Sequence, residues 1–86
     1  MPKYAIAKQL AGKRIITTDG EELGRVVDLY VNELNGKIES VILEPNPESS
    51  MATKAVDGVT TIAYSAVLDV KDVMVVDRRG LAAQMA

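Results

Sequence analysis

The sequence predicts a small all-β fold: a β-barrel of five or six antiparallel strands with one or two short helical turns. Short runs rich in Val, Ile and Thr recur along the 86-residue chain, and such runs are typical of strands. Asp-Gly and Asn-Gly pairs separate the first of these runs, and both pairs favour tight hairpin turns. No apolar run approaches the ~20 residues that a membrane-spanning helix requires.

The first half of the chain indicates a hairpin or meander between about Gly12 and Glu44. Its order is a strand at 13–18, an Asp19-Gly20 turn, a strand at 23–33, an Asn35-Gly36 turn and a return strand at 37–44. In the second strand, Gly24 and several β-branched residues disfavour a rival helix. Strict alternation would place Leu23, Val27, Leu29 and Val31 on one face, and Gly24, Val26, Asp28 and Tyr30 on the other.

The second half begins with a long exposed loop at 45–58, because Pro, Ser and Asn dominate that segment. Strands are then expected at 59–64 and 71–77, with a single helical turn at 65–69 capped by Ser65 between them. Residues 4–10 favour another helical turn that ends at Gly12. We expect one domain over residues 1–86, with a core from about 10 to 78 and a flexible tail at 79–86.

Composition argues against catalysis. The chain has no Cys and no His, which removes disulfides, the commonest metal ligands and the commonest general base. The carboxylates at 19, 21 and 22 are expected to be solvated turn residues with ordinary pKa values, and Arg78 and Arg79 to be solvated as well. We therefore predict a protein that is not an enzyme and has no catalytic residue, cofactor or metal.

Charge narrows the choice of partners. The net charge is −2 and only three aromatic residues are present, which argues against direct binding of nucleic acid. Contact with a membrane is expected only indirectly, through a partner. A cytoplasmic location fits the lack of Cys.

Apolar side chains occupy both faces of the predicted strands. They are either scattered surface residues, which are normal, or a second face that another chain buries. We expect a homodimer, because a core of this size is marginal alone. The predicted dimer or partner interface consists of Val26, Tyr30, Val41, Leu43, Met74 and Val76. A further partner motif is predicted in the apolar tail at Leu81 and Met85.

Two stretches of the chain resemble the PRC-barrel domain. Residues 10–43, LAGKRIITTDGEELGRVVDLYVNELNGKIESVIL, show a Gly-Lys start, an apolar strand, an Asp-Gly turn, a Gly-x-Val-x-Asp strand and an Asn-Gly turn. Residues 60–77, TTIAYSAVLDVKDVMVVD, show an Ile-x-Tyr strand, a one-turn element and a closing strand. Ala63 stands where the family usually has Pro. The resemblance implies a small barrel that acts as an adaptor and not as a catalyst.

The chain is most similar to the stand-alone archaeal members of this family, which include the CdpB cell-division proteins. That resemblance implies a protein–protein adaptor in FtsZ/SepF-based archaeal cell division, with recruitment to the division site. The implied partners are SepF or another PRC-barrel protein. The alternative is a ribosome or RNA-processing accessory protein similar to RimM, which would act through protein contacts.

Overall fold

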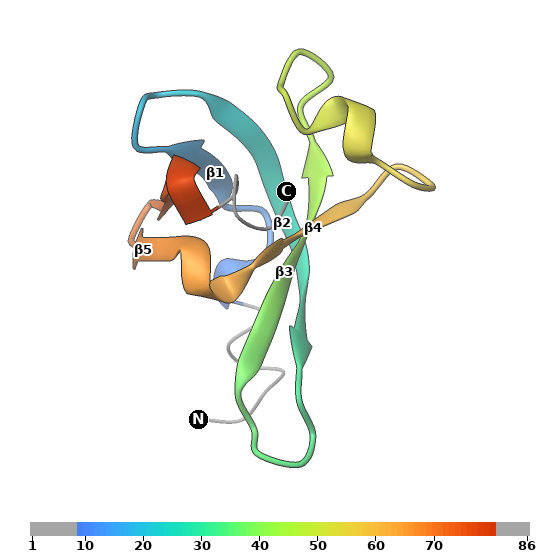
Figure 1. The fold of residues 1–86 in the computed structure, drawn as a ribbon, viewed down its shortest axis with the longest axis vertical. Coiled ribbons are helices and arrows are strands. Elements are labelled where there is room, and N and C mark those ends of the chain that lie inside the picture. Colours follow the sequence, from blue (N-terminus) through green and yellow to red (C-terminus); the bar gives the residue numbers. More distant parts are fainter. Residues whose placement is uncertain (1–8, 81–86) are drawn as a thin grey trace.

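Residues 9–80 are described by the computed structural model, and they form one six-stranded β-sheet (Figure 1). The strands are β1 (Arg14–Thr17), β2 (Glu22–Val31), β3 (Ile38–Pro45), β4 (Thr60–Ala63), β5 (Val67–Val70) and β6 (Val73–Val76). Two short 3-10 turns, η1 (Ala52–Lys54) and η2 (Tyr64–Ala66), complete the elements. The predicted all-β class with short helical turns is confirmed.

Two features of the predicted barrel are wrong. The sheet has the order β4-β3-β2-β1-β6-β5 and is not closed. It is also mixed, because β1 pairs in parallel with β6 while the other neighbours are antiparallel. A parallel pair cannot be joined by a tight turn, so the turn signals between consecutive strands carry no information about this pairing.

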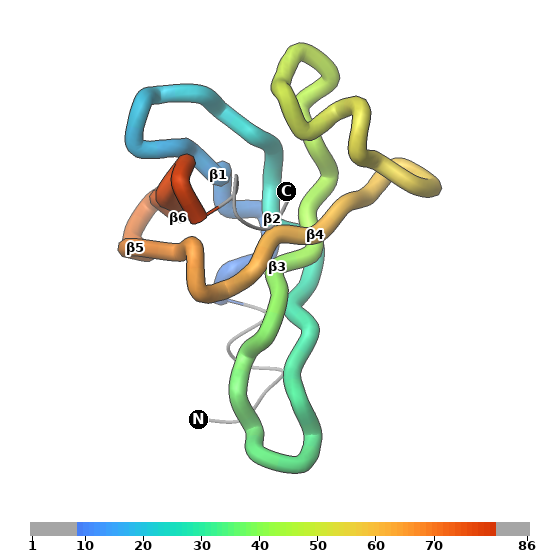
Figure 2. Tube along the Cα trace, viewed as in Figure 1, coloured from blue at the N-terminus to red at the C-terminus, as the bar shows by residue number. Residues whose placement is uncertain are grey.

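The two edge strands lie close together in the chain. β4 and β5 form opposite edges of the sheet, yet only the three residues of η2 separate them. The sheet therefore has to curl until its edges approach each other at η2, as the trace in Figure 2 shows. The result is a barrel-like sheet with one interior.

Two bulges decide which side chains of β2 point into this interior. Leu23 is an extra residue in the pairing with β1, and Val27 is an extra residue in the pairing with β3. Each bulge shifts the alternation of side chains by one position. Leu23, Val26 and Leu29 are consequently all buried, whereas Val27 is 47% exposed. The predicted faces are therefore wrong for Val26 and Val27.

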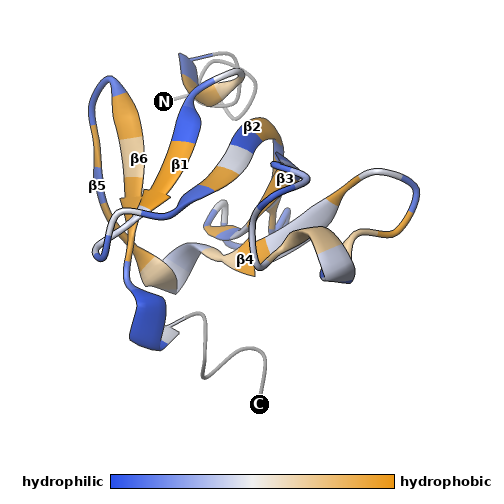
Figure 3. Cartoon of the chain, turned by 90° about the horizontal axis from the view of Figure 1, so that it is seen from above, coloured by the Kyte–Doolittle hydropathy of each residue, from blue (hydrophilic) through white to orange (hydrophobic). Residues whose placement is uncertain are grey.

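One core fills the interior of the curled sheet. Its fully buried large side chains are Ile15, Leu23, Val41, Leu43, Ile62, Met74 and Val76. Five strands contribute to this set. Figure 3 shows apolar residues along these strands and hydrophilic residues in most of the connecting turns.

Five of the six residues predicted to form an interface belong to this core. They are Val26, Val41, Leu43, Met74 and Val76, and each is at most 2% exposed. Their placement on a second, outer face is wrong, because the bulges of β2 and the β1–β6 pairing give them room inside the same chain. Tyr30 alone is on the surface, with 57% of its area exposed. Leu81 and Met85 lie outside the described residues.

The segment from 45 to 58 is docked onto the sheet and is not the exposed loop that its composition predicts. Met51 and Ser49 within it are buried. The Oγ of Ser49 donates hydrogen bonds to the carbonyls of Leu23, at 3.1 Å, and Asn46, at 2.7 Å. The buried Met51 side chain adds apolar contact, since it joins the main core.

Turn prediction succeeded where the signals are local. Gly20 and Gly36 have positive φ, as hairpin turns at Asp19-Gly20 and Asn35-Gly36 require. Another Asp-Gly pair, Asp57-Gly58, makes a third tight turn, which is closed by backbone hydrogen bonds in both directions between residues 56 and 59. The loop prediction for 45–58 does not contain this turn.

The predicted helical turns need smaller corrections. The turn expected at 65–69 is η2, which begins one residue earlier and has Ala63, not Ser65, at its N-cap. The remainder of that segment is β5. Of the turn expected at 4–10, Gln9 and Leu10 are helical, and the other residues lie outside the described part.

Leu43→Ala is expected to lower the free energy of unfolding by about 2–4 kcal/mol, because it leaves a cavity in the core. Leu68→Ala on β5 is the matched control and should cost less than about 1 kcal/mol, since Leu68 is 59% exposed. Urea unfolding followed by circular dichroism measures both values. Equal losses would contradict the assignment of Leu43 to the core and Leu68 to the surface.

Candidate functional site

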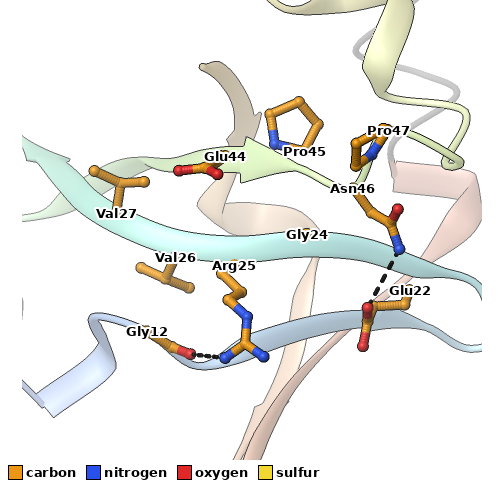
Figure 4. Close-up of a pocket in the computed structure, with 10 residues that line it drawn as sticks. All are labelled: Gly12, Glu22, Gly24, Arg25, Val26, Val27, Glu44, Pro45, Asn46 and Pro47. Atoms are coloured by element: carbon orange, nitrogen blue, oxygen red, sulfur yellow. Dashed lines mark hydrogen bonds between the residues drawn. The ribbon is translucent and has the colours of Figure 1, made fainter. Parts of the chain in front are cut away.

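A groove of about 410 Å³ lies over β2 where the strand passes Gly24 (Figure 4). One wall is formed by the end of β3 and by Pro47 beyond it. Gly24 has a φ of +155°, and a Cβ there would lie 2.2 Å from the carbonyl oxygen of Glu44. Only glycine permits this close approach of two backbones. The missing side chain of Gly24 therefore allows β2 and β3 to pack closely beside the groove.

Hydrogen bonds engage most polar groups around this groove. Glu22 pairs through Oε1 with Arg14 at 3.3 Å and accepts a hydrogen bond at Oε2 from Asn46 at 3.3 Å. The Nη1 of Arg25 donates to the carbonyl of Gly12 at 3.2 Å. Among the described residues that line the groove, no nucleophile is paired with a general base. The walls of the groove are both polar and apolar.

A cluster around Arg78 joins three segments that are distant in the chain. The Nη2 of Arg78 donates to Oε1 of Glu21 at 2.6 Å and to Oδ1 of Asp19 at 3.1 Å. Ser50 donates to Glu21 from its backbone N–H at 2.8 Å and from Oγ at 2.9 Å. The buried Thr17 donates to Asp19 and accepts from the backbone N–H of Glu21 at 2.9 Å. The cluster therefore ties the β1–β2 turn to the 46–51 segment and to the chain after β6.

This cluster corrects the prediction for Arg78 and for two turn carboxylates. Arg78 is engaged, whereas the side chain of Arg79 is 93% exposed. The pKa of Asp19 is lowered, first by the Thr17 hydrogen bond and then by Arg78. The pKa of Glu21 is lowered, first by the Ser50 backbone N–H and then by Arg78. A general acid at neutral pH needs a raised pKa, so both carboxylates are poorly suited to that role.

The outer face of the β2–β3 hairpin carries exposed apolar side chains. Val27 and Tyr30 project from β2, and the partly buried Ile42 of β3 lies opposite Asp28, between them in the pairing. We call Val27, Tyr30 and Ile42 the outer strip. Of its members, the interface prediction contained only Tyr30.

The tip of the same hairpin carries Leu34, which is 98% exposed. Figure 1 shows that this hairpin extends well beyond the rest of the sheet. Leu34 was not among the predicted interface residues. Its exposure could have been found from the sequence, because it is the one large apolar residue inside the polar turn segment NELNGK.

The chain is similar to a known domain family over most of its length. The PRC-barrel domain model matches residues 4–82. The chain belongs to the PRC-barrel domain family. The match includes both stretches that resemble the family in sequence, and also the 45–58 segment between them. No curated protein matches the chain.

The described residues contain neither a helix suited to cross a membrane nor a group of carboxylates suited to hold a metal. Within residues 9–80 of this PRC-barrel protein, none of the helices has the length and apolar character needed to cross a bilayer. In the same range, no group of three or more carboxylates is arranged to hold a metal ion. Asp19, Glu21 and Glu22, the carboxylates of the first turn, instead contact cationic and polar side chains.

Arg78→Ala is expected to lower the free energy of unfolding by about 1 kcal/mol at pH 7, because partly exposed ion pairs contribute modestly. The melting temperature should fall by about 4–8 °C for a domain of this size. Arg79→Ala is the matched control and should stay within about 0.5 kcal/mol of the parent protein. Thermal unfolding by calorimetry distinguishes them, and equal effects would contradict the role of the cluster.

Arg78→Ala should also change how the free energy of unfolding depends on pH in acid. The lowered pKa values mean that the contribution of Asp19 and Glu21 is present above their ordinary values of 3.8 and 4.5. It is lost as the pH falls through the folded-state values. Below about pH 4.5, the free energy of unfolding of Arg78→Ala should fall less steeply with decreasing pH than that of the parent protein. Part of the slope should remain, because Thr17 and Ser50 still donate hydrogen bonds to the two carboxylates. An unchanged acid slope would contradict this coupling.

Proposed function

We propose that this PRC-barrel protein is a non-catalytic adaptor that binds other proteins through the β2–β3 hairpin. The observation that carries the proposal is the exposure of Val27, Tyr30 and Leu34 outside a core that is already filled. Apolar side chains grouped on one protruding element are typical of interaction surfaces. The lowered pKa values of the turn carboxylates and the absence of Cys and His support a role without catalysis.

Within this function we propose self-association through the outer strip. The burial of Val41, Leu43 and their neighbours removes the original argument for a dimer, so the dimer now depends on Val27 and Tyr30. Tyr30 is one of only three aromatic residues in the chain. Tyrosine is enriched where interfaces gain most of their binding energy, which supports a pairing centred on this residue.

The biological setting that we propose is archaeal cell division, with SepF or another PRC-barrel protein as the partner. The similarity to stand-alone archaeal PRC-barrel proteins supports this setting. The protein would be cytoplasmic and would reach the membrane at the division site only through its partner. The net charge of −2 fits this indirect contact, since it gives no attraction to an anionic membrane surface.

The partner is tested by a pull-down with purified components. The tagged chain is expected to retain SepF or a second PRC-barrel protein from the same organism, while a tagged unrelated domain should retain neither. Ribosomal subunits are included as competing prey. Retention of ribosomal subunits alone would contradict the division setting and favour the alternative of an accessory protein similar to RimM.

Self-association is tested by light scattering at micromolar concentration. The parent protein should have twice the monomer mass. Tyr30→Asp should weaken association at least about tenfold, because it buries a charge at the centre of the proposed contact. Leu68→Asp is the matched control, since Leu68 is 59% exposed on β5 away from the hairpin. A monomeric parent protein, or equal effects of both variants, would overturn the proposed dimer.

A further inference from the structure

We propose that the tip of the β2–β3 hairpin, residues 32–37, is a docking element. In this proposal Leu34 packs against an apolar surface of a partner protein, and Lys or Arg side chains flank that surface. The proposal rests on the adaptor function given above. It assigns to that function a second surface, which adjoins the outer strip that would pair two copies and shares Tyr30 with it.

The exposure of Leu34 cannot be explained by packing within the described chain. Leu34 is 98% exposed, and it is one of residues 29–34, which line a groove of about 420 Å³. Tyr30 contributes to the same groove. An apolar knob beside a partly apolar groove is the arrangement in which a partner gains contact area around one anchor residue.

Hydrogen bonds fix the tip in one conformation without a partner. The backbone N–H of Asn32 donates to the carbonyl of Lys37 at 2.8 Å, and that of Gly36 donates to the carbonyl of Asn32 at 2.8 Å. The Oδ1 of Asn32 accepts from the N–H of Leu34 at 2.9 Å, and the Oδ1 of Asn35 accepts from the N–H of Lys37 at 2.9 Å. Little conformational entropy would be lost on docking, because the loop is already ordered.

The charge around the tip identifies the chemistry of the partner. Residues 28–39, which include the tip, carry three carboxylates, Asp28, Glu33 and Glu39, and one cation, Lys37. Acidic groups repel the phosphates of nucleic acids and of anionic membranes. They favour a protein surface whose apolar contact area is flanked by Lys or Arg side chains. We therefore assign the tip to a protein partner of that kind.

The test is a nuclear magnetic resonance titration of the full-length ¹⁵N-labelled chain. The probe is a synthetic amphipathic helix of about 18 residues, made of Leu on one face and Lys on the other. We expect chemical-shift changes at Tyr30 and residues 32–37. A matched helix with Glu in place of Lys should bind at least about tenfold more weakly.

Variants localise the binding to the tip. Leu34→Asn should weaken probe binding at least about tenfold. Val56→Asn should leave it unchanged, because Val56 is also strongly exposed but belongs to a turn far from the tip (Figure 2). Glu39→Gln keeps the acceptor for Asn32 and removes one charge, and it should weaken binding about two- to threefold at low salt. Amide spectra of each variant report whether the fold is intact.

Three results would overturn the proposal. The first is an equal response to the Lys and Glu helices, or to Leu34→Asn and Val56→Asn. The second is stronger binding of the tip to vesicles of phosphatidylglycerol than to the Lys helix, which would assign the tip to a membrane. The third is a shift at residues 32–37 that depends on the concentration of the chain itself, which would assign the tip to a contact between copies.

This titration can fail independently of the proposed function. If the pull-down retains SepF and the Lys helix does not bind residues 32–37, the adaptor function holds and the docking element is elsewhere. If the helix binds the tip and the pull-down retains neither division protein, the docking element holds and the proposed setting is wrong.

Discussion

The rest of the structure depends on which side chains of β2 point into the interior of the curled sheet. This strand pairs with β1 along its first half and with β3 along most of its length, so it is central to the sheet. Its two bulges turn Leu23, Val26 and Leu29 toward one interior at a spacing of three residues instead of two. A regular strand with this sequence would expose Val26 and bury Val27. Gly24 adds a second condition, because its missing side chain lets β3 pass close to the strand.

The core and the outer strip are two results of this single constraint. The bulge that buries Val26 also moves Val27 to the outside, where it joins Tyr30. An 86-residue chain without Phe or Trp has few large side chains with which to fill an interior. The two bulges allow it to place more of its aliphatic residues inside. Three of the large apolar residues that remain exposed in the described part, Val27, Tyr30 and Leu34, lie on one hairpin, whereas Val56 and Leu68 lie elsewhere.

Local signals in the sequence predicted the local structure. Runs of β-branched residues placed five of the strands, and the Asp19-Gly20 and Asn35-Gly36 pairs placed two turns. The bulge at Val27 has no such signal, since it arises from how β2 meets β3. The β1–β6 pairing and the Arg78 cluster could not be predicted for a related reason: Arg78 is 57 residues from Glu21 in the chain. Leu34 is different, because an apolar residue in a polar turn can be recognised from the sequence alone.

The lengths of the neighbouring strands explain why the tip of the β2–β3 hairpin projects beyond the rest of the sheet. β4 pairs with β3 only as far as Ser40, and β1 pairs with β2 only as far as Arg25. Beyond these points, and beyond the backbone hydrogen bonds of Val26 with Gly12 and Lys13, β2 and β3 pair only with each other in the described sheet, and an isolated pair of strands is marginally stable. The hydrogen bonds of Asn32 and Asn35 stabilise this projecting end. None of them involves the side chain of Leu34, and a polar residue would satisfy the same backbone bonds. The turn itself therefore does not require an apolar side chain at this position, which supports the docking element that we propose.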